Sequence, residues 1–273
     1  MLKKLLTLLT VSVLSFSLLS TKAVSDVITL HVPVLEESLE QHLFYHELLE
    51  TAIQEIGHTP NLIASRLPQL RIKSYLQHGL ISLYWMVESE QRNQRYIPIE
   101  IGLTNKLIGK RILFIKKGDQ HLFKSVENIE DFQNLNFVAH LGKKWFDVKV
   151  WQENDLAYKE HSGSWKQIFR MIEQGTRHNY FPRGINEILM EAQQHPNLAI
   201  EKRLVLIYDR DFRFYLSNTG INAGSRYKNV IEQAMIKAQQ SGLIERLIKK
   251  YWGSDFDILE YDNRIKILLQ TPK

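Results

Sequence analysis

The sequence predicts an α/β fold, in which strands and helices alternate along the chain. The apolar, β-branched run Val27–Val34 is typical of a strand. Apolar residues then recur at near-helical spacing from Glu36 to Ile56, and Gly57 ends that pattern. The continuous apolar run Leu80–Val87 indicates a strand that is covered on both faces. Together these segments predict the start of an open α/β sheet.

The segments around these runs continue the alternation. In the first half we expect a strand at Asn61–Ala64, a helix at Leu67–Gln77, and strands at Pro98–Leu103 and Arg111–Ile115. In the second half we expect helices at Asn128–Leu135, Trp145–Glu153 and Ser164–Gln174 (with Ser164 as N-cap), a helix that follows Gly184 and ends at Gln194, and a helix at Ala223–Trp252 with a break near Gly242. We expect strands at Asn136–His140, Ala157–His161, Tyr180–Phe181, Ala199–Tyr208 and Phe212–Leu216. No flexible linker separates the two α/β halves, so we expect the chain to cross between two lobes and to return.

The N-terminal segment 1–23 is interpreted as a secretory signal peptide. Lys3 and Lys4 precede a short apolar run, and small residues follow up to Ala23. The alternative is an uncleaved N-terminal anchor. Since a lipoprotein needs a cysteine at the cleavage site and the chain has none, we expect a periplasmic protein without a lipid anchor.

Charge and composition exclude several classes of function. The chain has 273 residues and a formal charge of +5, which falls to +2 when the three lysines of the leader are removed. A nucleic-acid partner is therefore not expected. Without cysteine there are no disulfides, thiolate zinc sites or iron–sulfur clusters. The sequence also lacks H-E-x-x-H, P-loop, G-x-S-x-G and G-x-G-x-x-G motifs, so we expect no metal, no cofactor and no catalytic residues.

The order of segments resembles extracellular solute-binding protein family 3, the amino-acid-binding-like class of type II periplasmic binding proteins. The matching segments are Ser89–Ile99 (SEQRNQRYIPI), Arg111–Asp119 (RILFIKKGD), Val126–Asp147 (VENIEDFQNLNFVAHLGKKWFD), Ser164–Gly175 (SWKQIFRMIEQG), FRFYLSNTG and SGLIERLIKKYWG. The resemblance implies two lobes with a ligand cleft between them. Lobe one would be 24–110 plus 208–273, and lobe two would be 111–207.

In lobe one the resemblance implies that Arg92 binds a ligand carboxylate, with Arg95 as a second candidate. Tyr84 and Trp85 end the predicted strand Leu80–Val87. These aromatic residues either pack in the core or form a wall of the cleft, because open α/β sheets bind ligands beyond the carboxyl ends of their strands.

In lobe two the predicted contacts follow strand ends. Gly142, Lys143, Lys144 and Trp145 lie between a strand and a helix, either as a surface loop or as backbone N–H donors for an anion. His161 and Ser164 precede the next helix, and Tyr180 and Arg183 lie in NYFPRG. The ligand-binding prediction is therefore Tyr84, Trp85, Arg92, Lys143, Trp145, His161, Ser164, Tyr180 and Arg183.

The stretch NYFPRG departs from the family pattern because it has no carboxylate for a ligand ammonium. Arg183 either pairs with Glu187 or helps to bind an anionic ligand, since two arginines could clamp two acidic groups. We therefore expect a monomeric, non-enzymatic binder of a small polar, anionic or amino-acid-like solute, acting with a membrane importer or a sensor receptor. The alternatives are a dehydratase-like enzyme on the same scaffold and a ligand-free interaction module.

Overall fold

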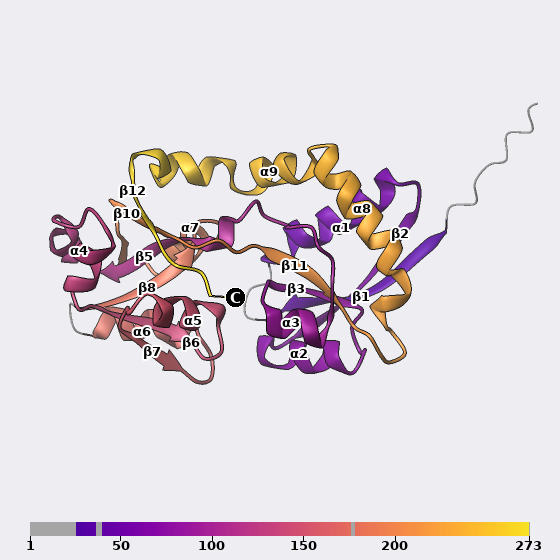
Figure 1. Ribbon diagram of the computed structural model, residues 1–273, viewed down its shortest axis with the longest axis horizontal. Helices are drawn as coiled ribbons and strands as arrows, with labels where there is room; N and C mark the ends of the chain where they lie inside the picture. Colours follow the sequence, from indigo (N-terminus) through magenta and orange to yellow (C-terminus); the bar gives the residue numbers. More distant parts are fainter. Residues whose placement is uncertain (1–25, 37–39, 176–177, 273) are drawn as a thin grey trace, which may run out of the picture.

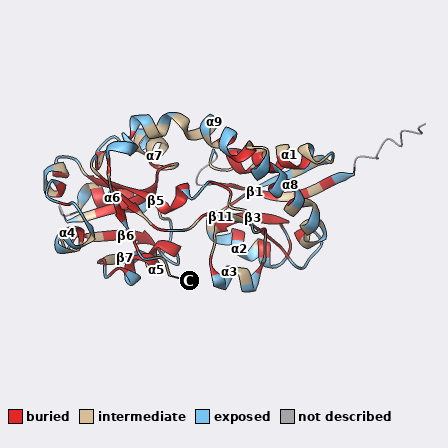
Figure 2. Ribbon diagram, turned by 45° about the horizontal axis from the view of Figure 1, so that its top comes forward, coloured by how far each residue is buried: buried red, intermediate tan, exposed pale blue. Residues whose placement is uncertain are grey.

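A computed structural model describes residues 26–36, 40–175 and 178–272, and it confirms the α/β class (Figure 1). The segment predicted to be a signal peptide lies outside the described residues. The described chain forms two α/β lobes side by side, and the strands inside each lobe are mostly buried (Figure 2). Among the described residues, no helix has both the length and the apolar character that a membrane crossing requires.

The core of the first lobe is formed by segments from the early part and from the later part of the described chain. Its strands are β1 (Val27–Leu35), β2 (Thr59–Leu67), β3 (Leu83–Val87), β4 (Ile97–Pro98) and β11 (Phe212–Leu216), and its helices are α1 (Leu43–Glu55), α2 (Gln69–Gln77), α3 (Glu90–Arg95) and α8 (Lys228–Gln240). Strands β1 and β2 pair in parallel, whereas β11 pairs antiparallel with both β3 and β4. The Ser82 N–H donates to the His31 carbonyl at 2.7 Å, which joins the two groups of strands.

The second lobe is built on one mixed sheet in the order β12-β10-β5-β8-β6-β7, with β9 also pairing with β5. Its strands are β5 (Lys110–Lys116), β6 (Val138–Gly142), β7 (Tyr158–His161), β8 (Asn179–Gly184), β9 (Leu198–Ile200), β10 (Leu204–Ile207) and β12 (Ile265–Leu268), and its helices are α4 (Ile129–Asn134), α5 (Phe146–Glu153), α6 (Gln167–Gln174) and α7 (Ile188–Gln194). Short 3₁₀ turns complete the described chain at Leu107–Gly109, Asp119–Phe123, Gly224–Tyr227 and Tyr261–Asn263.

Two crossover segments connect the lobes and lie against each other. The Tyr208 N–H donates to the Gly109 carbonyl at 3.0 Å. The buried Asp211 carboxylate accepts bonds from the backbone N–H groups of Thr104 and Lys106 and from the Thr104 hydroxyl. A side chain at Gly102 would collide with that carboxylate, since an added Cβ would lie 2.4 Å from its oxygen. The two crossings are thus held together by one buried acid.

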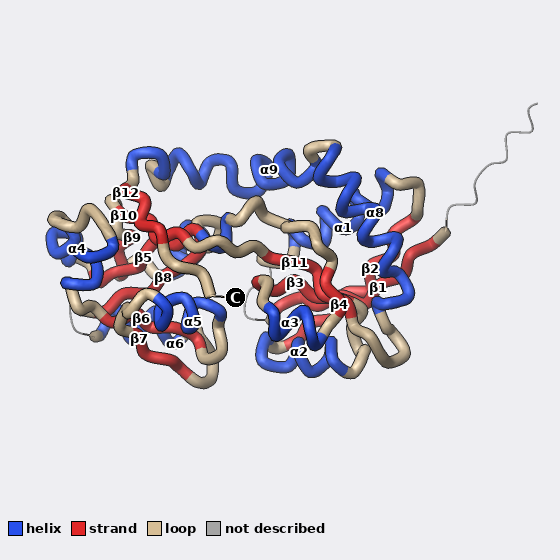
Figure 3. Tube along the Cα trace, in the orientation of Figure 1, coloured by secondary structure: helices blue, strands red, loops and turns tan. Residues whose placement is uncertain are grey.

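The chain crosses between the lobes a third time, which the sequence pattern did not predict. Helix α9 (Leu243–Ile258) extends from lobe one to lobe two (Figure 3), and its Ile248 and Trp252 pack against the cores of both. Strand β12 then pairs in parallel with β10. The expected assignment of 208–273 to lobe one is therefore wrong for β12, whose Ile267 is buried in the core of lobe two.

Several element boundaries also differ from the expected ones. The strand expected at Ala199–Tyr208 is divided into β9 and β10, because the buried Glu201 accepts bonds from the backbone N–H groups of Arg203 and Leu204 and turns the chain there. The strand expected at Pro98–Leu103 is reduced to β4. Helix α6 begins at Gln167, so Ser164 is not its N-cap, and Lys166 holds that position without a side-chain bond.

Candidate functional site

Arg92 lies in the short helix α3, which follows β3 at the edge of lobe one that faces lobe two (Figure 1). Its guanidinium donates to the Val87 carbonyl and is partly buried. Burial lowers the pKa of Arg92, and tyrosine side chains oppose that shift. Within the described residues, no carboxylate forms an ion pair with it. Arg92 is therefore a desolvated cation without an anionic partner among these residues, which is unfavourable unless a bound group compensates it.

Tyrosines surround this cation and position its helix. The hydroxyl of Tyr215, on β11, donates to Asn93 Oδ1 at 2.9 Å and accepts from the Ser89 N–H at 3.4 Å. The Tyr96 hydroxyl donates to the Lys73 carbonyl at 3.3 Å, which connects α3 to α2. Tyr84 and Tyr208 also act on the charge of Arg92. The O–H protons of Tyr96 and Tyr215 are already donated within the protein, so these hydroxyls can only accept from a bound solute beside the guanidinium.

The other predicted residues of lobe one have different roles. Trp85 is buried and stacks on Tyr45, with 4.4 Å between ring centroids, so it is a core residue and not a wall of the cleft. Tyr84 is also largely buried but acts on Arg92. Arg95 is exposed, and its guanidinium donates to the Gln77 side chain. Of the two arginines, Arg92 is thus the partly buried one and Arg95 the exposed one.

The Gly142–Trp145 loop of lobe two does not present free backbone donors to an anion. The Lys143 N–H donates to the His161 carbonyl at 3.0 Å, and the Lys144 N–H donates to a Glu160 oxygen at 3.3 Å. The Trp145 N–H donates to the Gly142 carbonyl at 3.1 Å. The anion-donor interpretation is wrong for these three groups. What the loop exposes is the side chains of Lys143 and Lys144.

Arg183 on β8 is buried and already fully paired. Its guanidinium makes a bidentate contact with Glu191, at 2.8 Å from Nε and 2.6 Å from Nη2, and it lies 3.2 Å from Glu187. Although burial alone would lower it, the carboxylates of Glu187 and Glu191 raise the pKa of Arg183. The predicted ligand contact is therefore wrong here, and the alternative pairing with Glu187 is confirmed.

Aromatic rings enclose the same guanidinium. Its carbon lies 4.7 Å from the ring centroid of Trp165 and 5.2 Å from those of Trp145 and Phe181. Cation–π contact with these rings adds to the ion pairs. Trp145, a predicted ligand contact, thus lies against the chain's own arginine. This aromatic cage is filled by a cation of the protein itself.

A second buried arginine is paired beside Arg183 and shares Glu187 with it. Arg111, on β5, contacts Asp147 at 2.8 Å and Glu187 at 3.3 Å, and Tyr208 Oη is 3.4 Å from Asp147. Arg111 and Asp147 are both buried. This part of lobe two is an internal network of charges.

The remaining predicted contacts of lobe two are also structural or peripheral. Tyr180 is fully buried, and its hydroxyl accepts from the Trp151 indole N–H at 2.8 Å, so it is a core residue. His161 stacks on His140, with centroids 4.7 Å apart. Ser164 is exposed in the turn before α6. No contact places His161 or Ser164 beside Arg92 in the described chain.

Sequence reasoning missed Lys73, which lies on α2 and faces lobe two. The residue is exposed at the surface of α2. Desolvation by the surrounding protein and the positive charges of Arg92, Lys144 and Arg95 lower the pKa of Lys73 to about 8. Lys144 belongs to the other lobe, so cations of both lobes act on one another. Nothing in the local sequence signals this, because Lys73 is an ordinary helix-surface lysine until the lobes are placed.

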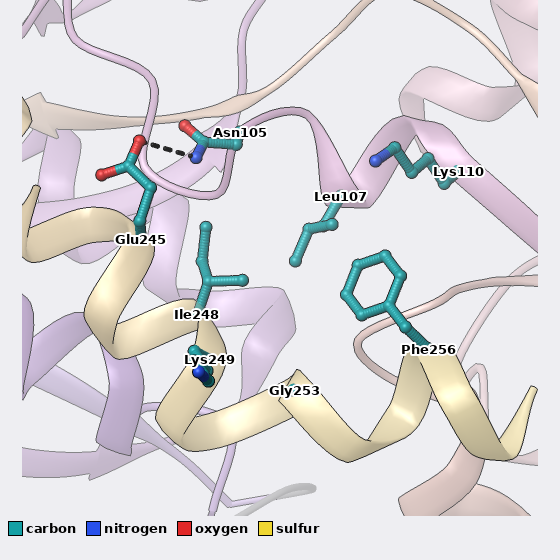
Figure 4. A pocket seen from close by; sticks show the side chains of 8 residues that line it. All are labelled: Asn105, Leu107, Lys110, Glu245, Ile248, Lys249, Gly253 and Phe256. Atoms are coloured by element: carbon teal, nitrogen blue, oxygen red, sulfur yellow. Dashed lines mark hydrogen bonds between the residues drawn. The ribbon is translucent and has the colours of Figure 1, made fainter. Parts of the chain in front are cut away.

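A cavity of about 320 Å³ lies between the first crossover segment and α9 (Figure 4). Leu107, Ile248 and Phe256 form its apolar walls, and Glu245 accepts from the Asn105 amide at 3.2 Å at its rim. None of the predicted site residues lines it. Within the described residues, no group of three histidine, aspartate or glutamate side chains is arranged to hold a metal ion.

Comparison with known proteins finds similarity in structure and none by family model or curated sequence. No family model and no curated protein matches the sequence. Many solved structures match the fold. An ancestral arginine-binding protein bound to arginine matches with a TM-score of 0.56 and 15% identity, covering 82% of this chain and 98% of that one.

Two further structures give the same result. An amino-acid ABC transporter substrate-binding protein from Streptococcus pneumoniae, bound to L-arginine, matches with a TM-score of 0.58 and 14% identity over 83% of this chain and 95% of that one. An ancestral amino-acid-binding protein, described as a precursor of cyclohexadienyl dehydratase, matches with a TM-score of 0.56 and 13% identity over 82% and 94%. The chain therefore has the type II periplasmic-binding-protein fold of amino-acid ABC transporter substrate-binding proteins.

Proposed function

We propose that this protein is an exported solute-binding protein that traps a small polar solute between its two lobes. The observation that carries the proposal is Arg92, a partly buried cation without a carboxylate partner in the described chain, at the edge of lobe one that faces lobe two. The basic and apolar N-terminal segment supports export to the periplasm. A membrane importer or a sensor receptor would receive the closed form.

Arg92 would act by pairing with an acidic group of the solute. A guanidinium binds a carboxylate through parallel hydrogen bonds, and such charge-assisted bonds are stronger in a partly dry site. The hydroxyl oxygens of Tyr96 and Tyr215 can accept from a donor group on the rest of the solute. Binding would then shift the lobes toward the closed arrangement, because only the closed form contacts the solute from both sides.

An enzyme on the same scaffold is the second candidate, since one structure with this fold is described as the precursor of a dehydratase. Such a reaction needs an acid or base held next to the bound solute. The described groups around the charge of Arg92 are tyrosines, whose pKa values are raised by burial at Tyr96 and Tyr215, and Lys73, whose pKa of about 8 makes it the one candidate base among these groups. Neutral phenols suit binding better than proton transfer at neutral pH.

A thermal-shift screen tests the proposal. The full mature chain is mixed with amino acids, dicarboxylates, peptides and polyamines, and a binder raises the melting temperature by mass action. We expect at least one solute to stabilise the protein and Arg92→Ala to abolish that shift. Arg71→Ala, at an exposed position on α2, is the matched control. If no solute stabilises the protein, the binding function is refuted, whereas conversion of a stabilising solute to product would establish the enzyme.

A further inference from the structure

The charges of the facing edges restrict which solutes can bind, given the function proposed above. In lobe one, Lys73 on α2 and Arg92 on α3 are held together by the bond from the Tyr96 hydroxyl to the Lys73 carbonyl. Both helices lie opposite α5 of lobe two (Figure 1), and Lys144 lies two residues before the first residue of α5. The positive charge of Lys144 acts on Lys73 across the space between the lobes. Cations of both lobes therefore face the same space.

Nearby carboxylates do not neutralise this cluster in the described chain. Glu88 contacts Arg213 at 2.6 Å. Glu90 keeps its negative charge, since the Gln94 amide that donates to it at 2.9 Å is neutral, but it forms no ion pair with Arg92 or Lys73 among the described residues. Glu160 accepts from the backbone N–H of Lys144, but the Lys144 amine forms no ion pair among the described residues. Like charges repel, so the two lobes resist closure until an anion lies between them.

The aromatic cage and the carboxylates of lobe two, which could otherwise bind a cation, already hold an arginine of the protein. Arg183 fills the cage of Trp145, Trp165 and Phe181, and Glu191 and Glu187 pair with it. Neither the rings nor these carboxylates are available to a cationic group of a solute. An ordinary zwitterion would bring an ammonium into a space that holds cations and would find no carboxylate of this network free.

We infer that the solute is a small dianion, whose first acidic group binds Arg92 and whose second is bound between Lys73 of lobe one and Lys144 of lobe two. The second group would thus bridge the lobes and remove the repulsion that holds them apart. Closure would depend on charge number, since a monoanion could neutralise Arg92 and leave Lys73 and Lys144 unpaired. A dicarboxylate and a phosphate ester share this chemistry.

The test compares affinities of the full mature chain for defined probes by isothermal titration calorimetry. The probes with two acidic groups are the dianions succinate and glutarate and 3-phosphoglycerate, whose phosphate adds a third negative charge, and the comparators are L-glutamine and L-arginine. We expect a dianion to bind at least tenfold more tightly than either comparator, with an affinity that falls as salt rises. The dicarboxylates and the phosphate ester distinguish the two sources of the second charge.

Variants locate the second charge. Lys144→Gln and Lys73→Gln should each weaken binding of the preferred dianion about tenfold and reduce its salt dependence. Lys149→Gln, which removes an exposed lysine from α5, should leave both unchanged. If the comparators bind and the dianions do not, or if neither lysine variant changes dianion affinity, the inference is wrong while the binding function stands. If none of these probes and no solute of the wider screen binds, the proposed function itself fails.

Discussion

The two lobes each carry a buried or partly buried arginine near the facing edges, and the two arginines differ in what pairs with them. Arg183 of lobe two has a bidentate carboxylate, a second carboxylate and a cage of aromatic rings. Arg92 of lobe one has a backbone carbonyl and tyrosines. Removing a guanidinium that the protein has neutralised leaves buried carboxylates without a partner, whereas Arg92 has no carboxylate partner among the described residues to leave behind.

The largest effect is expected at Arg183. Arg183→Ala leaves the buried Glu191 and Glu187 without a principal partner, which should lower the free energy of unfolding by about 3–5 kcal/mol. Urea denaturation measures this loss. Arg170→Ala, at an exposed residue of α6, is the control and should change stability by less than about 0.5 kcal/mol. A small loss at Arg183 would mean that its ion pairs do not stabilise lobe two, and the contrast with Arg92 would disappear.

The next effect concerns the joint between the lobes. Asp211→Ala removes the acceptor shared by Thr104, Lys106 and Phe212 and leaves buried donors unpaired. We expect a loss of about 2–3 kcal/mol in unfolding free energy, since each unsatisfied buried donor costs about 1–3 kcal/mol and water can reach part of this turn. Faster amide exchange at residues 104–106 should accompany it. Asp209→Ala, an exposed neighbour, should show neither change.

A substitution at Arg92 should weaken solute binding strongly and change stability little, the reverse of what is expected at Arg183. Arg92→Gln should weaken solute binding tenfold to a hundredfold, because charge-assisted hydrogen bonds contribute about 1.5–3 kcal/mol. Its effect on unfolding should stay below about 1 kcal/mol, since no carboxylate of the described chain loses a partner. Calorimetry and urea denaturation on the same preparation separate the two quantities. A variant that unfolds easily yet binds normally would reverse the roles assigned to the two arginines.

The smallest expected effect is a pH dependence at Lys73. Its pKa of about 8 means that the amine is charged below that pH and neutral above it. Affinity for a dianion should therefore fall a few-fold as pH rises from 7 to 9; the other charged groups that act on Lys73 are Arg92, Arg95 and Lys144. The pKa of Lys73 is lower in the folded than in the unfolded protein. Its positive charge therefore destabilises the fold below pH 8, and this destabilisation is lost as pH rises toward 10. Lys73→Gln should flatten the affinity profile, and an unchanged slope would remove Lys73 from the site.

Much of the fold could be predicted because strands and helices follow local apolar patterns. The runs at β1, β3 and β5 and the helical spacing of α1 are visible in single segments. Strand β12 could not be predicted, since four residues after a helix carry little pattern, and their pairing partner β10 lies some sixty positions earlier. Helix α9 reads as an amphipathic helix, but the pattern does not show that its two ends lie on different lobes.

The candidate site was less predictable than the fold, because the same residue type serves both purposes. Arg92 and Arg183 each follow or end a predicted strand, and their sequence neighbours do not show which of the two is paired. The partner that commits Arg183 is Glu191, eight positions later on α7, brought back by the turn after β8. Lys73 lacked any local signal, since its meaning depends on a lysine of the other lobe.

The sequence by itself determined the α/β alternation and which segments are buried, because the hydrophobic effect acts on each segment according to its own apolar period. It also determined the absence of cysteine chemistry. The tertiary structure alone decided which charges are neutralised. Electrostatic pairing depends on distances between groups far apart in the chain. The close contacts of Arg183, and the lack of a carboxylate partner for Arg92 among the described residues, arise only when strands, helices and lobes are placed together.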